Sequence, residues 1–274
     1  MTVTTQPKAE PATRRHEHEF EIAASPDTVW KAITEAEELV NWFPIQAEVE
    51  PGPGGCITYR WESLESACRI DAWQPGQHLR TSWMEGHGPA ADSQATPLAV
   101  DWYLQGDQGR TRLRLVHSGF GPGKDWDDEY SGTKRGWDFE LRLLKHYLEH
   151  HPGKRRTAQL IRKAVSLDAA QTWQKMFAAQ GLVRQMNPAW PQPGDPLRMS
   201  LSSGDRIEGE VLVHEPPSDF GFTAANLNQA VVRIAFESCF GSPEAQLWVS
   251  LWDFPQQEAS ALKDRLSKAL EELF

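Results

Sequence analysis

The sequence has few cysteines and no long hydrophobic run. Its three cysteines, Cys56, Cys68 and Cys239, are an odd number at irregular spacing, which excludes a disulfide framework and a CxxC zinc or redox motif. No segment approaches the roughly 18 consecutive apolar residues that a membrane-spanning helix needs. Residues 1–19 also lack the apolar core of a signal peptide. We therefore expect free thiols, no membrane insertion and a cytoplasmic protein.

The sequence also has fewer positive than negative charges. The chain has 28 Lys and Arg against 38 Asp and Glu, a net charge of −10, and residues 1–152 alone carry a net charge of −9. Such a molecule does not attract nucleic acid or anionic lipid as a whole. We expect neither of them as a partner.

Tryptophan, in contrast, is abundant, with 12 Trp against 4 Tyr. Side chains this large and flat suit either a well-filled core or an aromatic-lined pocket. The length of 274 residues is nearly twice a typical domain of about 150 residues, which favours two domains. The position of the tryptophans in those domains is therefore the central question for function.

The first half reads as one strand, two short helices, a meander and a long helix. After a leader at 1–15 that we expect to be disordered, a strand through Ile22 leads to Ser25-Pro26-Asp27, a helix start. A second short helix around Leu39 follows. From Val49 the apolar period becomes two, with turns between the runs and a loop at 85–97. The long closing helix shows an apolar face at steps of three and four: Trp137, Leu141, Leu144, Leu148.

The second half repeats this order after a linker near residue 152. A strand at about 160–167 leads to Asp168, which precedes a helix, and further strands follow at 231–236 and 247–251. A last helix carries an apolar face: Ala259, Leu262, Leu266, Leu270. We predict two domains of one plan, at 16–152 and 153–274, the second diverged from the first.

Local motifs add a family resemblance. The run from Ile22 to Trp30 resembles the opening of the START-like superfamily, also called SRPBCC or birch-pollen-allergen-like. The turns at 51–55 and 74–75, the Thr81-Ser82-Trp83 triplet, the run 111–120 and Gly136-Trp137 look like its activator of heat-shock protein 90 ATPase homologue branch. The resemblance implies an α+β helix-grip fold: a curved antiparallel sheet around a long helix, with an apolar cavity between them.

Alternation along 110–117 places Thr111, Leu113, Leu115 and His117 on the face toward the long helix. His117 then points into or near the implied cavity, where imidazole can bind a ligand or act as acid or base. The alternative is a core histidine with a backbone partner. The residues expected to line a ligand site are Trp30, Trp61, Trp83, Trp102, His117, Trp137, Leu141. The tryptophans could instead simply fill the space.

Other motifs give weaker evidence for a function. The run His146-Tyr147-Leu148-Glu149-His150 matches the H-x-x-E-H zinc-protease pattern by letter, but histidines in the last turn of a helix are already favoured by its dipole. The glycines before Lys124 lack the spacing of a phosphate loop. No nucleophile motif is present. We expect no metal, no cofactor and no catalytic residue, except His117 if the protein is an enzyme.

Two tryptophans of the second half form a separate set. Alternation along 246–251 places Trp248, and Trp252 beyond it, on the face away from the last helix. Large exposed aromatic side chains need cover. We predict that Trp248 and Trp252 form an interface with the first domain or with a second chain.

Three functions fit these observations, in this order. The first is non-catalytic binding of a small hydrophobic molecule in the first domain. The second, implied by the resemblance, is a co-chaperone-like contact with heat-shock protein 90 or another protein, hence a link to the stress response. The third is an aromatase or cyclase-type reaction that uses His117, as in some members of the resembled superfamily.

Overall fold

The computed structural model describes residues 13–62, 64–84, 97–238 and 243–274. The expected leader at 1–15, apart from its last three residues, the expected loop at 85–97, apart from Pro97, and Cys239 lie outside the described residues. The first strand begins at Arg14, inside the expected leader, because the Arg14 guanidinium donates to Asp127 Oδ1 at 2.6 Å and to the Gly121 carbonyl at 2.9 Å.

The first sheet has seven antiparallel strands in the order β1-β7-β6-β5-β4-β3-β2. All pairings join consecutive strands except that of β1 with β7, so the chain forms a meander closed by its first strand. The strands are β1 (Arg14–Ile22), β2 (Gln46–Glu50), β3 (Cys56–Trp61), β4 (Leu64–Gln74), β5 (His78–Trp83), β6 (Ala99–Asp107) and β7 (Arg110–Phe120).

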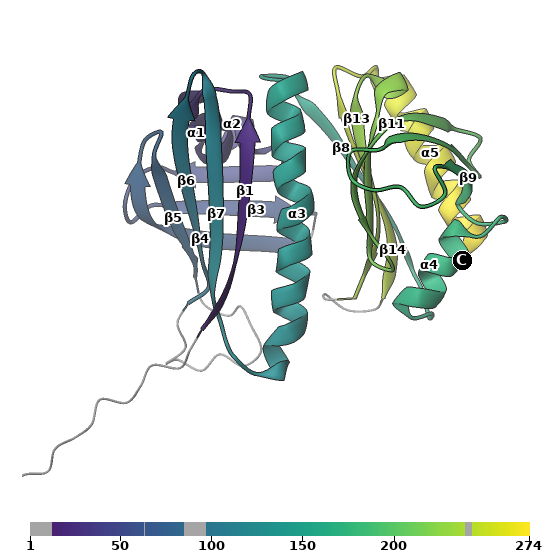
Figure 1. Ribbon diagram of the computed structural model, residues 1–274, viewed down its shortest axis with the longest axis horizontal. Coiled ribbons are helices and arrows are strands. Elements are labelled where there is room, and N and C mark those ends of the chain that lie inside the picture. The colour runs from purple at the N-terminus through teal and green to yellow at the C-terminus, as the bar shows by residue number, and fades with distance from the viewer. Residues whose placement is uncertain (1–12, 63, 85–96, 239–242) are drawn as a thin grey trace, which may run out of the picture.

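Helices cover one face of this sheet (Figure 1). They are α1 (Pro26–Thr34), α2 (Ala36–Leu39) and α3 (Asp127–His150), with a 3-10 turn η1 (Lys124–Trp126) before α3. The Ser25 hydroxyl caps α1 by accepting from the backbone N–H of Thr28, as the sequence predicts. The sheet and α3 form the expected helix grip.

The second sheet repeats the strand order of the first, β8-β14-β13-β12-β11-β10-β9. Its strands are β8 (Arg156–Ala164), β9 (Val183–Asn187), β10 (Pro196–Leu201), β11 (Arg206–Glu215), β12 (Asp219–Ala224), β13 (Ala230–Glu237) and β14 (Glu244–Trp252). One face packs on α4 (Ala169–Phe177) and α5 (Gln256–Leu273), and a 3-10 turn η2 (Ala225–Leu227) joins β12 to β13. The fold is α+β, with two helix-grip domains.

The first strand of this domain starts earlier than the sequence predicts. It runs from Arg156 to Ala164, not from 160 to 167, and pairs with β14 along its whole length. Its first residues are polar, so the apolar pattern does not show them. Two of them are held by specific partners: the Gln159 amide donates to the Ala259 carbonyl, and Arg156 binds the first domain, as described below.

Helix α3 lies between the two sheets (Figure 1). The predicted apolar stripe with Trp137 and Leu141 is buried, and Trp137 contacts the first sheet through His117 and Trp102. A second stripe at the same spacing, Phe139, Leu143 and His146, is also buried. Phe139 packs under Arg233 of β13, 5.1 Å from its guanidinium carbon. The helix is therefore covered by both domains.

The second sheet is consequently buried on both faces. Val213 and Val231 belong to the hydrophobic core of the first domain, whereas their strand neighbours Val211 and Val232 belong to that of the second. Gly221 is part of this fit, because a Cβ there would lie 2.9 Å from the Phe139 ring. Strands buried on both faces read as continuous apolar runs, as in β13.

A charged side chain holds the two domains together from the start of β8. The Arg156 guanidinium donates to four carbonyls that follow α2, at distances of 2.6 to 3.1 Å: those of Val40, Trp42, Phe43 and Pro44. The Arg156 backbone N–H donates to Asn41 Oδ1. The planar fork of arginine, with five donors, suits such a set of acceptors.

The two outward-facing tryptophans of β14 have different surroundings. Trp252 is fully buried, donates from Nε1 to the Asn41 carbonyl at 2.9 Å and stacks on His151 at 4.5 Å between ring centroids. Trp248 is half-buried and donates to Gln246 of its own strand. Trp252 thus packs on the first domain. None of the described helices is long and apolar enough to cross a membrane.

Substitution of Arg156 tests the joint between the domains. We expect Arg156→Leu to lower the free energy of unfolding by about 3 kcal/mol, because it leaves several part-buried carbonyls without a donor. Urea unfolding followed by tryptophan fluorescence measures this loss. Its exposed neighbour gives the control, because Arg155→Leu should change the midpoint little. Equal midpoints for the two variants would contradict the role of Arg156.

Candidate functional site

The structure brings four of the seven predicted ligand residues into direct contact. Trp83, at the end of β5, stacks on His117 of β7 at 4.9 Å between ring centroids, with 7° between the planes. Trp137 of α3 donates from Nε1 to His117 Nδ1 at 3.1 Å, and Trp102 of β6 meets Trp137 edge-on at 5.3 Å. We call these four residues the His117 cluster.

The other three predicted residues lie around this cluster. Trp61 reaches it through Phe43, whose ring is 5.1 Å from Trp61 and 5.6 Å from Trp137. Leu141 lies one turn beyond Trp137 on α3 and is 1% exposed. Trp30 packs against Trp73, edge-on at 5.1 Å. Trp30 and Leu141 belong, with Trp102 and Trp137, to one hydrophobic core, and Phe43, the neighbour of Trp61, packs against it.

His117 has an unsatisfied polar atom within this apolar setting. The residue is 1% exposed, and its Nε2 has no hydrogen-bond partner among the described residues. Phe120 lies 4.6 Å away between ring centroids, on a further side of the imidazole. Burial holds the pKa of His117 well below its usual value, with the neighbouring His16 and His18 adding to the effect. The imidazole is therefore neutral near pH 7.

Two histidines of β1 extend the polar part of the site. His16 is the cross-strand partner of His117, and their rings meet edge-on at 5.2 Å. His16 Nδ1 lies 3.1 Å from His18 Nε2, and His16 Nε2 lies 3.2 Å from the Thr133 hydroxyl. His18 Nδ1 lies 2.9 Å from Asp138 Oδ1. A chain of side chains thus joins the edge strand to α3.

The groups at the two ends of this chain have defined roles. The Asp138 carboxylate can only accept, so His18 Nδ1 donates to it. The Thr133 hydroxyl donates to the Glu129 carbonyl at 2.8 Å. Burial and, to a smaller extent, the neighbouring His18 lower the pKa of His16 to about 4. Burial by itself would raise the pKa of Asp138, but its bond to His18 brings it below the usual range.

Sequence reasoning missed several residues of the site. Phe43 and Phe120 complete the aromatic surroundings, and His16 and His18 complete the polar part. The alternation of His16 and His18 at one strand face was a usable signal, because residues i and i+2 share a face. It did not indicate His117 as their neighbour, since that depends on the pairing of β1 with β7.

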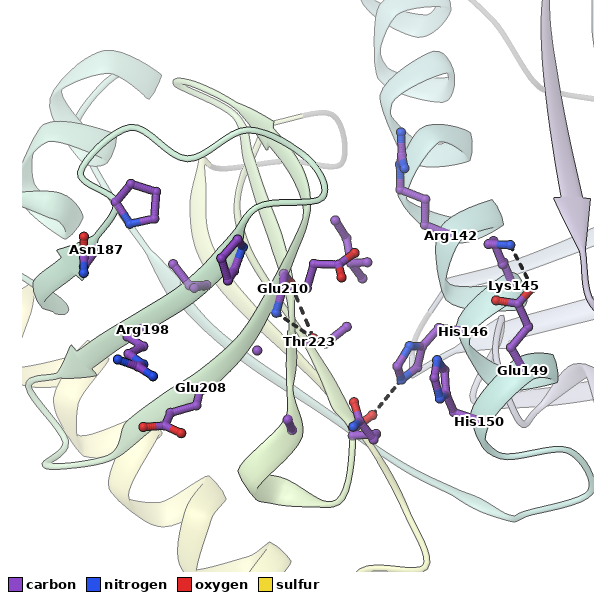
Figure 2. A pocket seen from close by; sticks show the side chains of 17 residues that line it. Arg142, Lys145, His146, Glu149, His150, Asn187, Arg198, Glu208, Glu210 and Thr223 are labelled. Carbon is purple, nitrogen blue, oxygen red and sulfur yellow. Dashed lines mark hydrogen bonds and ion pairs between the residues drawn. The ribbon is translucent and has the colours of Figure 1, made fainter.

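A pocket of about 900 Å³ lies elsewhere, between α3 and the second sheet. Figure 2 shows charged and histidine side chains on both walls: Arg142, Lys145, His146, Glu149 and His150 from α3, and Arg198, Glu208 and Glu210 from β10 and β11. Not one of the seven predicted ligand residues lines it. It is distinct from the His117 cluster.

The H-x-x-E-H run lies at this pocket. His146 Nε2 lies 2.7 Å from the Gln229 carbonyl, so this nitrogen is a donor and is already used. In the described ranges no group of three or more His, Cys, Asp or Glu side chains is arranged to hold a metal ion. The histidines here join α3 to the second domain, because His151 Nε2 also contacts the Gln229 carbonyl, at 3.2 Å.

Comparison with known proteins finds a family model that matches the first domain. The family model described as Activator of Hsp90 ATPase homolog 1-like protein matches residues 23–149. The first domain is similar to this family over that range. The match runs from the end of β1 to the end of α3, so the Hsp90-activator-like domain contains the whole His117 cluster. No curated protein matches the chain.

Several solved structures resemble the chain. The di-domain ARO/CYC BexL from the BE-7585A biosynthetic pathway has 14% identity and a TM-score of 0.44, with 94% of this chain and 99% of that chain covered. A Mesorhizobium loti protein has 24% identity and a TM-score of 0.45, with 50% and 98% covered. The Aha1 dimer from Colwellia psychrerythraea has 20% identity and a TM-score of 0.44, with 51% and 99% covered.

The lowered pKa of His16 predicts a pH-dependent stability of the Hsp90-activator-like domain. The unfolded state binds this proton near pH 6.5 and the folded state only near pH 4. The contribution of neutral His16 to the free energy of unfolding is therefore complete above pH 6.5, and it is lost as the pH falls toward 4. At about 1.4 kcal/mol for each pH unit, the loss is at most about 3.5 kcal/mol.

Urea unfolding at pH 7, 5.5 and 4.5 measures this loss. We expect His16→Gln to weaken the fall in the free energy of unfolding below pH 6.5. The exposed His150 gives the control, because His150→Gln should keep the pH dependence of the unchanged protein. A pH dependence that is the same in all three proteins would show that His16 does not contribute.

Proposed function

We propose that the first domain binds a small hydrophobic molecule in the grip between the first sheet and α3, against the His117 cluster. The observation that carries this proposal is the unpartnered Nε2 of His117, buried among aromatic rings. Buried polar atoms in folded proteins nearly always have a hydrogen-bond partner. A ligand that contacts these rings would supply the partner.

The surrounding side chains favour an aromatic ligand. Trp83 lies parallel to the His117 ring, and Trp102 and Trp137 are perpendicular to each other, so a planar molecule would find both stacking and edge contacts. Each such contact contributes about 0.5 to 1.5 kcal/mol beyond the buried area. Trp83 is half-buried, whereas His117, Trp102 and Trp137 are buried, so Trp83 is the most exposed member of the cluster.

The state of His117 favours binding over acid or base catalysis. Its Nδ1 accepts from Trp137, and its pKa lies well below the usual value because it is buried. A neutral imidazole whose free nitrogen carries the proton cannot take up another at that atom. The cation that would act as an acid is scarce near neutral pH. This residue therefore suits a positioning role in a binding site.

Binding of indane, an apolar bicyclic hydrocarbon, tests the proposed function. We expect saturable binding of one molecule per chain, measured by tryptophan fluorescence. Trp83→Ala should weaken binding about fivefold, because it removes an aromatic contact worth about 1 kcal/mol. Trp190, which is 75% exposed in the second domain, gives the control, because Trp190→Ala should bind indane as the unchanged protein does.

Two results would contradict the proposal. One is the absence of saturable indane binding, and the other is equal weakening by Trp83→Ala and Trp190→Ala. Native mass spectrometry of freshly purified protein adds a search for the natural ligand. A non-covalent adduct that is lost in Trp83→Ala and kept in Trp190→Ala would identify its mass.

The name of the family model supports a second candidate, a contact with heat-shock protein 90. The exposed face of β1 and β7 would offer alternating charges for such a contact, because Arg110, Arg112 and Arg114 pair there with glutamates of β1. Pull-down with purified chaperone and an assay of its ATPase activity distinguish the candidates. Chaperone binding without indane binding would favour the second candidate. If the chaperone is not captured and its ATPase activity is not stimulated, the second candidate is eliminated.

A further inference from the structure

The free nitrogen of His117 is a hydrogen-bond donor. The indole Nε1–H of Trp137 can only donate, and it points at His117 Nδ1 at 3.1 Å. Nδ1 must therefore be the unprotonated nitrogen of the neutral ring, and the proton lies on Nε2. The contact between α3 and β7 thus determines that His117 Nε2 donates. Without this contact, a ligand could bind either tautomer of the ring.

The neighbours of His117 do not satisfy this donor. The rings of Trp83 and Phe120 lie 4.9 and 4.6 Å from the imidazole. His16, the remaining ring neighbour on β1, uses both of its nitrogens for His18 and Thr133. The described residues therefore surround Nε2–H with apolar rings and offer it no acceptor. A buried donor without an acceptor costs roughly 1 to 3 kcal/mol, and a ligand can recover that cost.

We infer that the ligand carries a hydrogen-bond acceptor, such as a ketone carbonyl, which receives the Nε2–H of His117, and that Trp137 sets this preference. The inference rests on the proposed function and names the chemical class of its ligand: an aromatic or aliphatic ring system with a carbonyl at the end that faces His117. A ligand with a group that can only donate at that point, such as an indole N–H, is disfavoured, because two donors would meet.

Three bicyclic probes of similar size test this preference. 1-Indanone carries a carbonyl acceptor, indane carries neither acceptor nor donor, and indole carries an N–H donor. We expect the protein to bind 1-indanone roughly two- to tenfold more tightly than indane, the range of one net hydrogen bond, and indole no better than indane. Dissociation constants come from NMR titration of the labelled full-length protein.

Two variants assign the preference to the proposed residues. His117→Phe keeps an aromatic ring and removes the donor, so the affinities for 1-indanone and indane should become equal. Trp137→Phe removes the N–H that holds the tautomer, so the advantage of 1-indanone over indole should fall to less than about twofold. Trp102→Phe is the matched control, because it makes the same change in the neighbouring ring and keeps the bond between Trp137 and His117.

The outcomes separate this inference from the function on which it rests. Saturable binding of all three probes with equal affinity would overturn the inference and leave the proposed function in place. Tighter binding of indole than of 1-indanone would overturn it by showing an acceptor at Nε2. No binding of any probe would overturn both.

Nitrogen NMR of the histidine rings gives a direct reading of the tautomer. The His117→Phe spectrum identifies the signals of His117 by their loss. A proton on Nε2 in the unliganded protein supports the inference, and a proton on Nδ1 overturns it.

Discussion

Helix α3 packs against both sheets, and the arrangement of the two domains depends on this double contact. Its 24 residues present one apolar stripe to the first sheet and another, with Phe139 and Leu143, to the second. An amphipathic helix of a single domain has only one such stripe. The second sheet completes the arrangement, because Val213 and Val231 on its outer face enter the core of the first domain. Each domain thus covers apolar surface that the other would leave exposed.

This arrangement buries polar groups that need partners. The carbonyls after α2 receive the Arg156 guanidinium, and the Asn41 carbonyl receives Trp252. Nearby, Arg233 donates to Asp219, and burial raises the pKa of Glu140 to about 7, although Arg233 and Arg156 oppose the rise. Buried charges are tolerated where opposite charges and donors surround them. The interface is therefore specific in position as well as apolar.

The same helix gives the candidate site its chemistry. Trp137 lies on the stripe that faces the first sheet, and its N–H occupies one nitrogen of His117. The other nitrogen is buried and has no hydrogen-bond partner among the described residues, and the rings of Trp83 and Phe120 lie beside the imidazole. Asp138, the next residue of α3, fixes His18. Consecutive residues of one helix thus control two histidines on two strands, which links the shape of the grip to its hydrogen bonding.

Much of the fold was predictable from local patterns. The caps at Ser25 and Asp168, the period-two runs and the apolar stripes of α3 and α5 were all predictable from sequence, because each depends on residues a few positions apart. The motifs of the first half indicated a resemblance to the family whose model matches residues 23–149. Of the candidate site, the sequence predicted that His117 and Trp137 face one interior.

Only the tertiary structure decided how these elements meet. The sequence alone does not place His16 beside His117, because that neighbourhood depends on the register between β1 and β7, which are far apart in the chain. Nor does it show that Trp252 donates to the Asn41 carbonyl, or that Phe139 fits over Gly221. Periodicity determines which face of an element is apolar. The partner of that face is determined by sheet register and by the docking of one domain on the other.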